Sequence, residues 1–291
     1  MKKILTLKSP AKVNLYLKVF GAREDGYHNI ASLMQMIGLY DLLTFQPSSS
    51  GIRLQVKGGV LPPDRSNLVF RAAEALQKEA GTREGAEISL TKQIPIAAGL
   101  GGGSGDAAAT LIGLNRLWSL GWPRRRLARL GATLGSDIPF FFQGPTAWVF
   151  GRGEEVERFD ETPRGWILLI NPGRPISTAW VYQELSKLRL TRNAPNITIN
   201  KFNAERPSLE EILRHPYNDL ESVTFRAFPE LIQIKRELHR LGGKGALMSG
   251  SGPTLFAFFQ ERNMAIRAAR AIRKGGLDRV WVAKALKRSP L

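Results

Sequence analysis

The chain has 291 residues, a length that can bury a sizeable core either as one large domain or as two packed lobes. It contains no Cys, which excludes disulfides, thiolate catalysis and Cys-ligated metals, and no apolar run approaches the roughly 18–20 residues that span a bilayer. The net charge is +17, from 42 Lys and Arg residues against 25 Asp and Glu residues. The basic residues are scattered along the chain and are not interleaved with aromatics. We therefore expect a basic surface that attracts anionic substrates rather than nucleic acid.

The first half of the chain mixes strands and helices. Residues 1–8 are basic but lack the apolar stretch and cleavage site of a secretory signal, so we expect a first strand and a cytoplasmic protein. Alternating apolar residues predict half-buried strands over 13–19 and 52–56, with a turn at 48–51. The Ala-rich segment 68–80 predicts a helix ended by Gly81, residues 88–93 predict a strand, and Pro123 opens another helix.

The second half shows a similar alternation. We expect strands at 166–170, 255–259 and 280–283, and helices at 178–188, 229–241 and 264–272, with a polar loop over 190–207. Gly242 and Gly243 end the second of these helices. The pattern predicts an α+β protein of two lobes, 1–160 and 161–291, joined near 155–165 with the active site in the cleft between them.

A glycine-rich run precedes a predicted helix. Four of the five residues at 99–103 are Gly, which would weaken a helix or strand interior. We expect Ser104 to be an N-cap and Asp106 to begin the helix, so that unpaired N–H groups and the helix dipole bind phosphate. The P-loop pattern needs Lys where Ser104 stands, and the dinucleotide fingerprint fits loosely. A flexible surface loop is the alternative.

The string that begins at Pro95, P-x-x-x-G-L-G-G-G-S, resembles the ATP loop of the GHMP kinases. The family's other two motifs match at 9–17 and 248–256, in the same order, over nearly the whole chain. The resemblance implies a two-lobed GHMP-kinase-like fold, an ATP-dependent small-molecule kinase, and ATP with Mg²⁺. A monomer or weak homodimer is expected, without membrane or nucleic-acid partners.

One branch of the family is most similar. The pattern A-K-V-N-L-x-L at 11–17, with D-G-Y-H at 25–28, resembles the members that phosphorylate the 2-hydroxyl of 4-diphosphocytidyl-2-C-methyl-D-erythritol in the non-mevalonate isoprenoid pathway. The small-molecule substrate is then a cytidine diphosphate derivative. Another GHMP kinase, such as a homoserine kinase, is the alternative, and it would have no cytosine to stack on Tyr27. A basic nucleic-acid-binding protein would leave the glycine loop without a purpose.

The resemblance assigns catalytic roles to Lys12 and Asp137. Asp137 lies in a short polar turn before the apolar run 138–142, where a carboxylate can be half-buried yet open to a cleft. It would accept the proton of the acceptor hydroxyl, or only orient that group, while Lys12 supplies a cation. The alternatives are that Asp137 caps a helix before Pro139 and that Lys12 is a solvated strand residue.

The remaining site residues also follow from the resemblance. Asn14, Tyr27, His28, Thr178 and Tyr182 are expected to bind the substrate. Tyr27 and Tyr182 would lie on the cytosine, and His28 would read the edge of the base, partly through its backbone. Gly250, Ser251 and Gly252 would brace the phosphate loop or form a tight turn. The expected ATP-binding residues are Asn67, Lys92, Pro95, Ile96, Ala97, Ala98, Gly99, Leu100, Gly101, Gly102, Gly103, Ser104 and Gly105.

Metal ligands are not fixed by the sequence, although Ser104 and Asp106 are the nearest candidates because hard cations favour oxygen ligands and phosphate oxygens. The family loop often ends S-S-D-A-A, whereas this chain has Ser104-Gly105-Asp106. Gly105 therefore removes one hydroxyl that could contact phosphate or metal, while the backbone cradle remains.

Overall fold

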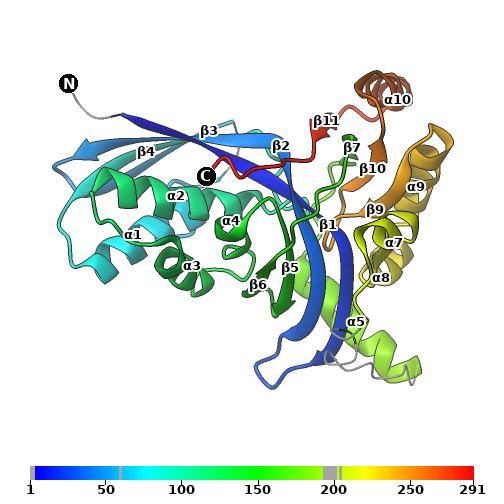
Figure 1. Ribbon diagram of the computed structural model, residues 1–291, viewed down its shortest axis with the longest axis horizontal. Helices are drawn as coiled ribbons and strands as arrows, with labels where there is room; N and C mark the ends of the chain where they lie inside the picture. Colours follow the sequence, from blue (N-terminus) through cyan, green and yellow to red (C-terminus); the bar gives the residue numbers. More distant parts are fainter. Residues whose placement is uncertain (1–3, 59–60, 193–201, 203–204) are drawn as a thin grey trace.

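Two sheets, each with helices packed against it, make up the fold of this computed structural model, which describes residues 4–58, 61–192, 202 and 205–291 (Figure 1). The larger sheet has seven strands in the order β3-β4-β2-β1-β8, and β5 pairs with both β2 and β6. Its strands are β1 (Leu5–Ala22), β2 (His28–Ser48), β3 (Ile52–Lys57), β4 (Gly85–Thr91), β5 (Thr146–Gly151), β6 (Glu155–Arg158) and β8 (Tyr217–Asn218).

The smaller sheet has four antiparallel strands in the order β11-β7-β10-β9. These are β7 (Trp166–Ile170), β9 (Lys244–Met248), β10 (Leu255–Phe259) and β11 (Val280–Lys284). Helices α9 and α10 pack against it, as Figure 1 shows on the right. The helices of this half are α5 (Thr178–Arg192), α7 (Leu209–Arg214), α8 (Glu221–Ala227), α9 (Glu230–Arg240) and α10 (Arg262–Lys274).

Four helices belong to the first half: α1 (Leu68–Ala80), α2 (Gly102–Leu117), α3 (Arg124–Ala132) and α4 (Phe140–Gln143). Helix α1 buries Val69, Ala72, Ala73 and Leu76, the i, i+3, i+4, i+7 spacing of one helical face. Helix α2 packs against α1 on one side and against β1 and β2 on the other. An added Cβ at Gly113 would lie 2.5 Å from the ring of Phe45, so the absence of a side chain there lets α2 approach the sheet.

The hairpin of β1 and β2 is long and irregular. The two strands pair from Leu5↔Phe45 to Ala22↔His28, with register shifts between Pro10 and Ala11 and again between Asn14 and Tyr16. A proline cannot donate to the ladder, and bulges bend a strand and redirect its side chains. A third shift lies between Val19 and Ala22. The first two flank Lys12 and Asn14, so they help to set the direction of these side chains.

Two later segments return to the first sheet. Strand β8 pairs with β1, and after β11 the chain bridges Ala285 to Ile37 and bonds the N–H of Leu286 to the carbonyl of Met36 at 3.0 Å. The C-terminus lies beside the first sheet in Figure 1. Apart from β8, the strands up to β6 belong to the first sheet and those from β7 onward to the second. The domain boundary predicted at residue 160 falls between β6 and β7, and it stays a prediction.

The expected α+β class is confirmed, as are the helix at 68–80 and the strands at 166–170 and 255–259. The strand expected at 13–19 is part of the longer β1, and the expected helix at 178–188 continues to residue 192. Within the loop expected at 190–207, residues 193–201 and 203–204 lie outside the described residues. In the described part of the chain, no helix is long and apolar enough to cross a membrane.

Candidate active site

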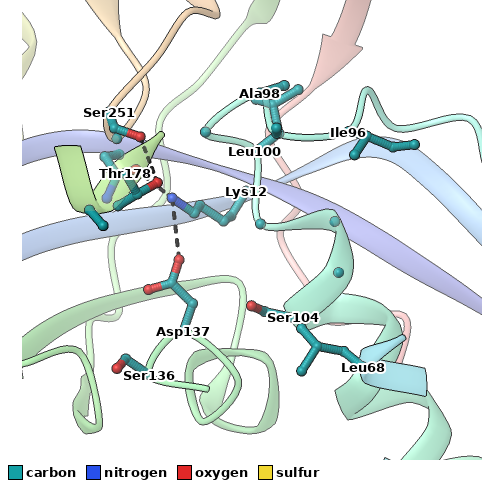
Figure 2. A pocket seen from close by; sticks show the side chains of 18 of the residues that line it. Lys12, Leu68, Ile96, Ala98, Leu100, Ser104, Ser136, Asp137, Thr178 and Ser251 are labelled. Atoms are coloured by element: carbon teal, nitrogen blue, oxygen red, sulfur yellow. Dashed lines mark hydrogen bonds and ion pairs between the residues drawn. The ribbon is translucent and has the colours of Figure 1, made fainter. Parts of the chain in front are cut away.

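A cavity of about 880 Å³ is lined by residues from both halves of the chain (Figure 2). The first half contributes Lys12, Asp137 and the loop before α2, and the second half contributes the start of α5 with Gly250 and Ser251. The cavity therefore brings together the three motifs that the sequence analysis singled out. Of the predicted site residues, all but Gly105 and Gly252 line it.

The phosphate loop ends one turn earlier than expected. Helix α2 begins at Gly102, and its N-cap is Gly101 in the left-handed region with φ +65°, with no side-chain capping bond in the described structure. The prediction of Ser104 as N-cap was therefore wrong, because glycines can start this helix without a polar cap. Ser104 lies in the first turn, whose N–H groups at Gly102, Gly103 and Ser104 have no carbonyl four residues before them within the helix.

Close packing explains two of the loop's glycines. A Cβ at Gly101 would lie 2.8 Å from Cγ of Lys12, and one at Gly105 would lie 2.8 Å from Oγ of Ser9 and 2.9 Å from the carbonyl oxygen of Pro10. Gly101 also needs its positive φ. At residue 105 the family loop often has Ser, whereas this chain has Gly. The close contact of α2 with β1 explains the glycine, because it leaves no room for a side chain there.

Lys12 and Asp137 form an ion pair at the cavity. The Nζ atom of Lys12 lies 3.6 Å from Oδ2 of Asp137 (Figure 2). It also donates to Oδ1 of Asn14 at 2.6 Å. Lys12 is only 3% exposed, whereas the Asp137 side chain is 32% exposed and open to the cavity. Burial lowers the pKa of Lys12, and the carboxylate of Asp137 opposes that shift. The structure thus rejects both alternatives: Lys12 is not solvated, and the N-cap of α4 is Pro139 rather than Asp137.

Ser249, which the sequence analysis did not assign, connects the two halves of the site. Its hydroxyl donates to the carbonyl of Gly99 at 2.8 Å and accepts from the backbone N–H of Asn14 at 3.3 Å. Asn14 in turn donates from Nδ2 to the hydroxyl of Ser32 at 2.8 Å. The segment after β9 therefore braces both the phosphate loop and the strand that carries Lys12.

The other end of the cavity is aromatic. Tyr27 is 51% exposed and has the guanidinium of Arg152 5.3 Å from its ring centre. His28 and Tyr182 lie with ring centres 5.4 Å apart, and burial raises the pKa of Tyr182, with Asp137 and Asp219 adding to the shift. The hydroxyl of Thr178, at the first residue of α5, lies 2.9 Å from that of Ser251 (Figure 2).

Asn67 and Lys92 line the cavity but are held by other contacts. Asn67 caps α1 by accepting from the N–H of Val69 at 3.0 Å. The ammonium of Lys92 donates to Asp41 and, at 2.8 Å, to Oδ2 of Asp106. Their binding of ATP, which the family resemblance implies at its adenine end, stays a prediction.

Asp106 is a poor candidate for a metal ligand. It is 1% exposed, and one of its oxygens is bonded to Lys92. Burial raises its pKa to about 7; Lys92 opposes this shift, while the nearby Asp41 adds to it. Among the described residues, no group of three or more His, Cys, Asp or Glu side chains could hold a metal ion.

Arg152 and Asp41 were also missed by sequence reasoning. Arg152 lines the cavity from the turn between β5 and β6, where Gly151 and Gly153 both have positive φ. A single Arg between two glycines is a weak signal, and Asp41 lies within a strand that the sequence analysis did not recognise. Both positions depend on pairing between distant strands.

The comparisons with known proteins agree with this geometry. The family profile described as GHMP kinases N terminal domain matches residues 67–145, and the one described as GHMP kinases C terminal matches residues 203–277. The 4-diphosphocytidyl-2-C-methyl-D-erythritol kinase of Syntrophus aciditrophicus is 45% identical over 284 residues, covering 97% of this chain and 100% of that protein. The chain belongs to the GHMP kinase family.

A second relative of this GHMP kinase, from Geobacter sulfurreducens and bearing the same name, is 46% identical and is matched over 99% of both chains. A crystal structure of 4-(cytidine 5'-diphospho)-2C-methyl-D-erythritol kinase superposes with a TM-score of 0.79 at 36% identity, covering 96% of this chain and 98% of that one. A homoserine kinase from Cytophaga hutchinsonii has a TM-score of 0.72 at 19% identity, covering 99% and 96%, and this likeness shows the fold alone.

Proposed function

We propose that this kinase transfers the γ-phosphoryl group of ATP to the 2-hydroxyl of 4-diphosphocytidyl-2-C-methyl-D-erythritol, in the non-mevalonate route to isoprenoid precursors. The observation that carries the proposal is a single cavity containing the first turn of α2, the Lys12–Asp137 pair and an aromatic end with Tyr27. Phosphate binding, proton acceptance and base recognition each have a place in it. The relatives at 45% and 46% identity carry the name of this activity.

ATP is bound with its phosphates at the N-terminus of α2. The N–H groups of Gly102, Gly103 and Ser104 and the helix dipole favour an anion there. The apolar side chains of Leu61, Leu68 and Ile96 line the same cavity and offer a surface for the adenine ring. Lys92 has three N–H donors, two of which go to carboxylates, so its third can serve the adenine end.

Magnesium enters the site with ATP. Because Mg²⁺ keeps several waters and binds phosphate oxygens, water and the triphosphate together would supply most of its ligands. Ser104, at the cavity wall, is the side chain that fits as an additional oxygen ligand. When bound, the ion would offset charge on the phosphates.

Asp137 accepts the proton of the acceptor hydroxyl. Its carboxylate faces the cavity and lies beside a buried cation, so an alcohol that bonds to Asp137 is also near Lys12. Phosphoryl transfer passes through a loose transition state, in which positioning and charge neutralisation do most of the work. The ammonium of Lys12 supplies that charge, and Asn14 fixes its position and contacts the methylerythritol.

The cytidine end of the substrate occupies the aromatic end of the cavity. The exposed ring of Tyr27 stacks on cytosine, with Tyr182 as the second aromatic, and His28 reads the edge of the base. Arg152, near the Tyr27 ring, is placed to neutralise the diphosphate, and Thr178 lies between this end and Ser251.

The test is an assay of ADP release with MgATP and either 4-diphosphocytidyl-2-C-methyl-D-erythritol or homoserine. The proposal predicts turnover with the cytidine substrate and none with homoserine, which has no base to occupy the aromatic end. Turnover with homoserine instead would place the chain elsewhere in the family. No ADP release with either would contradict the substrate assignment.

A further inference from the structure

The pairing of β2 with β4 ends just before the segment that leads to the phosphate loop. The last pair of this ladder is Leu42↔Thr91, at the end of β4. Asp41, the next residue of β2, uses its side chain instead: Oδ1 accepts from the backbone N–H of Gln93 at 2.6 Å and from that of Ile94 at 2.9 Å. A buried N–H group that has left a sheet needs another acceptor. One carboxylate oxygen therefore extends the hold of β2 beyond the ladder.

The second oxygen of the same carboxylate holds Lys92. The ammonium of Lys92 donates to Oδ2 of Asp41 and, at 2.8 Å, to Oδ2 of Asp106 in α2. All three side chains are buried. Breaking one of these bonds would leave a buried charged or polar group without its partner, which is costly, so the arrangement is well fixed. Asp41 thus ties β2 to the segment after β4 and, through Lys92, to α2.

Gly102, the first residue of α2, packs directly on this segment. A Cβ at Gly102 would lie 3.0 Å from Cγ2 of Ile94 and 3.3 Å from Nζ of Lys92. The backbone of Gly102 is therefore in close contact with both side chains. Its N–H is one of the groups that the first turn of α2 offers to phosphate. A shift of residues 92–94 would consequently move the N–H groups that bind the anion.

We propose that Asp41 is a positioning residue for ATP, whose carboxylate holds Lys92 and Ile94 in place so that the first turn of α2 stays where it binds the phosphates. This inference rests on the proposed function, in which the phosphates lie at the N-terminus of α2. Asp41 is not among the residues that line the cavity, so it acts only through its partners. The aromatic end of the cavity, with Tyr27 and Tyr182, is formed by other segments. Loss of Asp41 should therefore weaken the binding of ATP and spare that of the acceptor.

Two variants of Asp41 separate its contacts. Asp41→Ala removes all three hydrogen bonds. Asp41→Asn keeps one oxygen, which can accept from the two backbone N–H groups, and turns an amide –NH₂ toward the ammonium of Lys92, so that only this contact is lost.

The matched control is Asn115→Ala. Asn115, at the far end of α2, also ties down a loop backbone: it accepts from the N–H of Trp122 at 3.0 Å and donates to the carbonyl of Trp122 at 3.1 Å. Asn115 does not line the cavity. The control variant therefore loses hydrogen bonds and stability without a change at the phosphate loop.

Three measurements compare these proteins, with thermal unfolding to confirm that each is folded. The first is the Kd of MgATP without an acceptor, by isothermal titration. The second is the pair of KM values for ATP and for the cytidine substrate. The third is hydrogen exchange of residues 92–101 in the free protein, by mass spectrometry. A purely structural role for Asp41 would lower stability but would not single out ATP.

We expect Asp41→Ala to raise the Kd and KM of ATP about tenfold or more, because the segment beneath Gly102 loses three bonds, and to speed exchange in 92–101. The KM of the cytidine substrate should stay within about twofold. Asp41→Asn should raise the ATP constants about threefold without faster exchange. Asn115→Ala should be less stable, with unchanged ATP constants.

An unchanged Kd of MgATP in folded Asp41→Ala overturns the inference, as does an equal rise in KM for both substrates. If Asp41→Ala does not fold, an unchanged Kd in Asp41→Asn overturns it instead. If the unaltered protein bound no MgATP, the proposed function would fail and the role of Asp41 toward ATP with it. Because the titration needs no acceptor, a failure to turn over the cytidine substrate would contradict only the substrate assignment.

Discussion

The Nζ atom of Lys12 lies 3.6 Å from the carboxylate of Asp137, although one stands on β1 and the other in the turn between α3 and α4. Lys12 is buried and Asp137 faces the cavity, so the pair presents a carboxylate to a substrate while the cation stays beneath it. Asn14, also on β1, accepts a hydrogen bond from Lys12, and Ser249, which follows β9 of the second sheet, accepts one from the backbone N–H of Asn14.

Lys12 gives the reaction a basic pH limit. Burial lowers its pKa below the ordinary value of 10.5, although Asp137 opposes the shift. The ammonium is the form that neutralises the transferred phosphoryl group, so kcat/KM should fall as pH rises, with an apparent pKa below 10.5. Rates measured from pH 7 to 10.5, with circular dichroism to confirm folding, check this. Lys12→Arg, whose charge persists, should lose activity without showing that limit. A profile that stays flat to pH 10.5 would contradict the prediction.

Gly105 and Gly103 should differ sharply when replaced by Ala. Both lie in α2, where Ala is the better helix former. At Gly105 the new methyl would meet Oγ of Ser9 at 2.8 Å and the carbonyl of Pro10 at 2.9 Å, whereas at Gly103 it would meet one methyl of Leu68 at 3.5 Å. Gly105→Ala should cost about 1–3 kcal/mol of unfolding free energy. Gly103→Ala should leave the unfolding free energy unchanged or raise it by a few tenths of a kcal/mol. Urea unfolding of both proteins measures the difference. Equal stability of the two variants would count against the close approach of α2 to β1.

Asp106 should make stability depend on pH. Burial raises its folded pKa to about 7 from an ordinary value of 3.8, so the folded state favours the protonated form, and the stability this adds at low pH is lost as pH rises through about 7. The Asn of Asp106→Asn cannot ionise. The stability of this variant, relative to that of the unaltered protein, should therefore be greater at pH 8 than at pH 5.

The matched control is Asp64→Asn. Asp64 is exposed, and its hydrogen bonds from Ser66 lower its pKa, so it is ionised at both pH values and its difference should not change between them. Chemical denaturation of the three proteins at pH 5 and pH 8 measures these differences. A pH-independent effect of Asp106→Asn would show that Lys92 keeps the carboxylate ionised throughout.

The sequence predicted elements whose signals are local. The helix at 68–80 has an apolar face and a terminal Gly81, and the strand at 166–170 is a short apolar run, so both were found where they lie. The start of α2 was misplaced because glycines replaced a polar cap, and a cap residue was sought at Ser104. Strand β2, which joins β1 to β4 and β5, lacks a regular alternation because much of it is buried on both faces.

The candidate site also contains residues that the sequence could identify and residues that depend on contacts between distant segments. Motif residues such as Lys12 and Asp137 could be named from the sequence through the family resemblance. The Asp41–Lys92–Asp106 cluster could not, because it requires knowing that β2, β4 and α2 meet beneath the phosphate loop. Arg152 escaped for a similar reason, since the ring that it contacts, Tyr27, is distant in sequence.

The central claim is that Asp137 accepts a proton during phosphoryl transfer to the cytidine substrate. The most direct measurement is the initial rate of ADP formation from MgATP and 4-diphosphocytidyl-2-C-methyl-D-erythritol, for the unaltered protein and for Asp137→Ala, with thermal unfolding of both as the control for folding. The account predicts turnover in the first and a loss of about 10²–10⁴-fold in the second, at similar unfolding temperatures. Turnover of folded Asp137→Ala within about tenfold of the unaltered rate would contradict it.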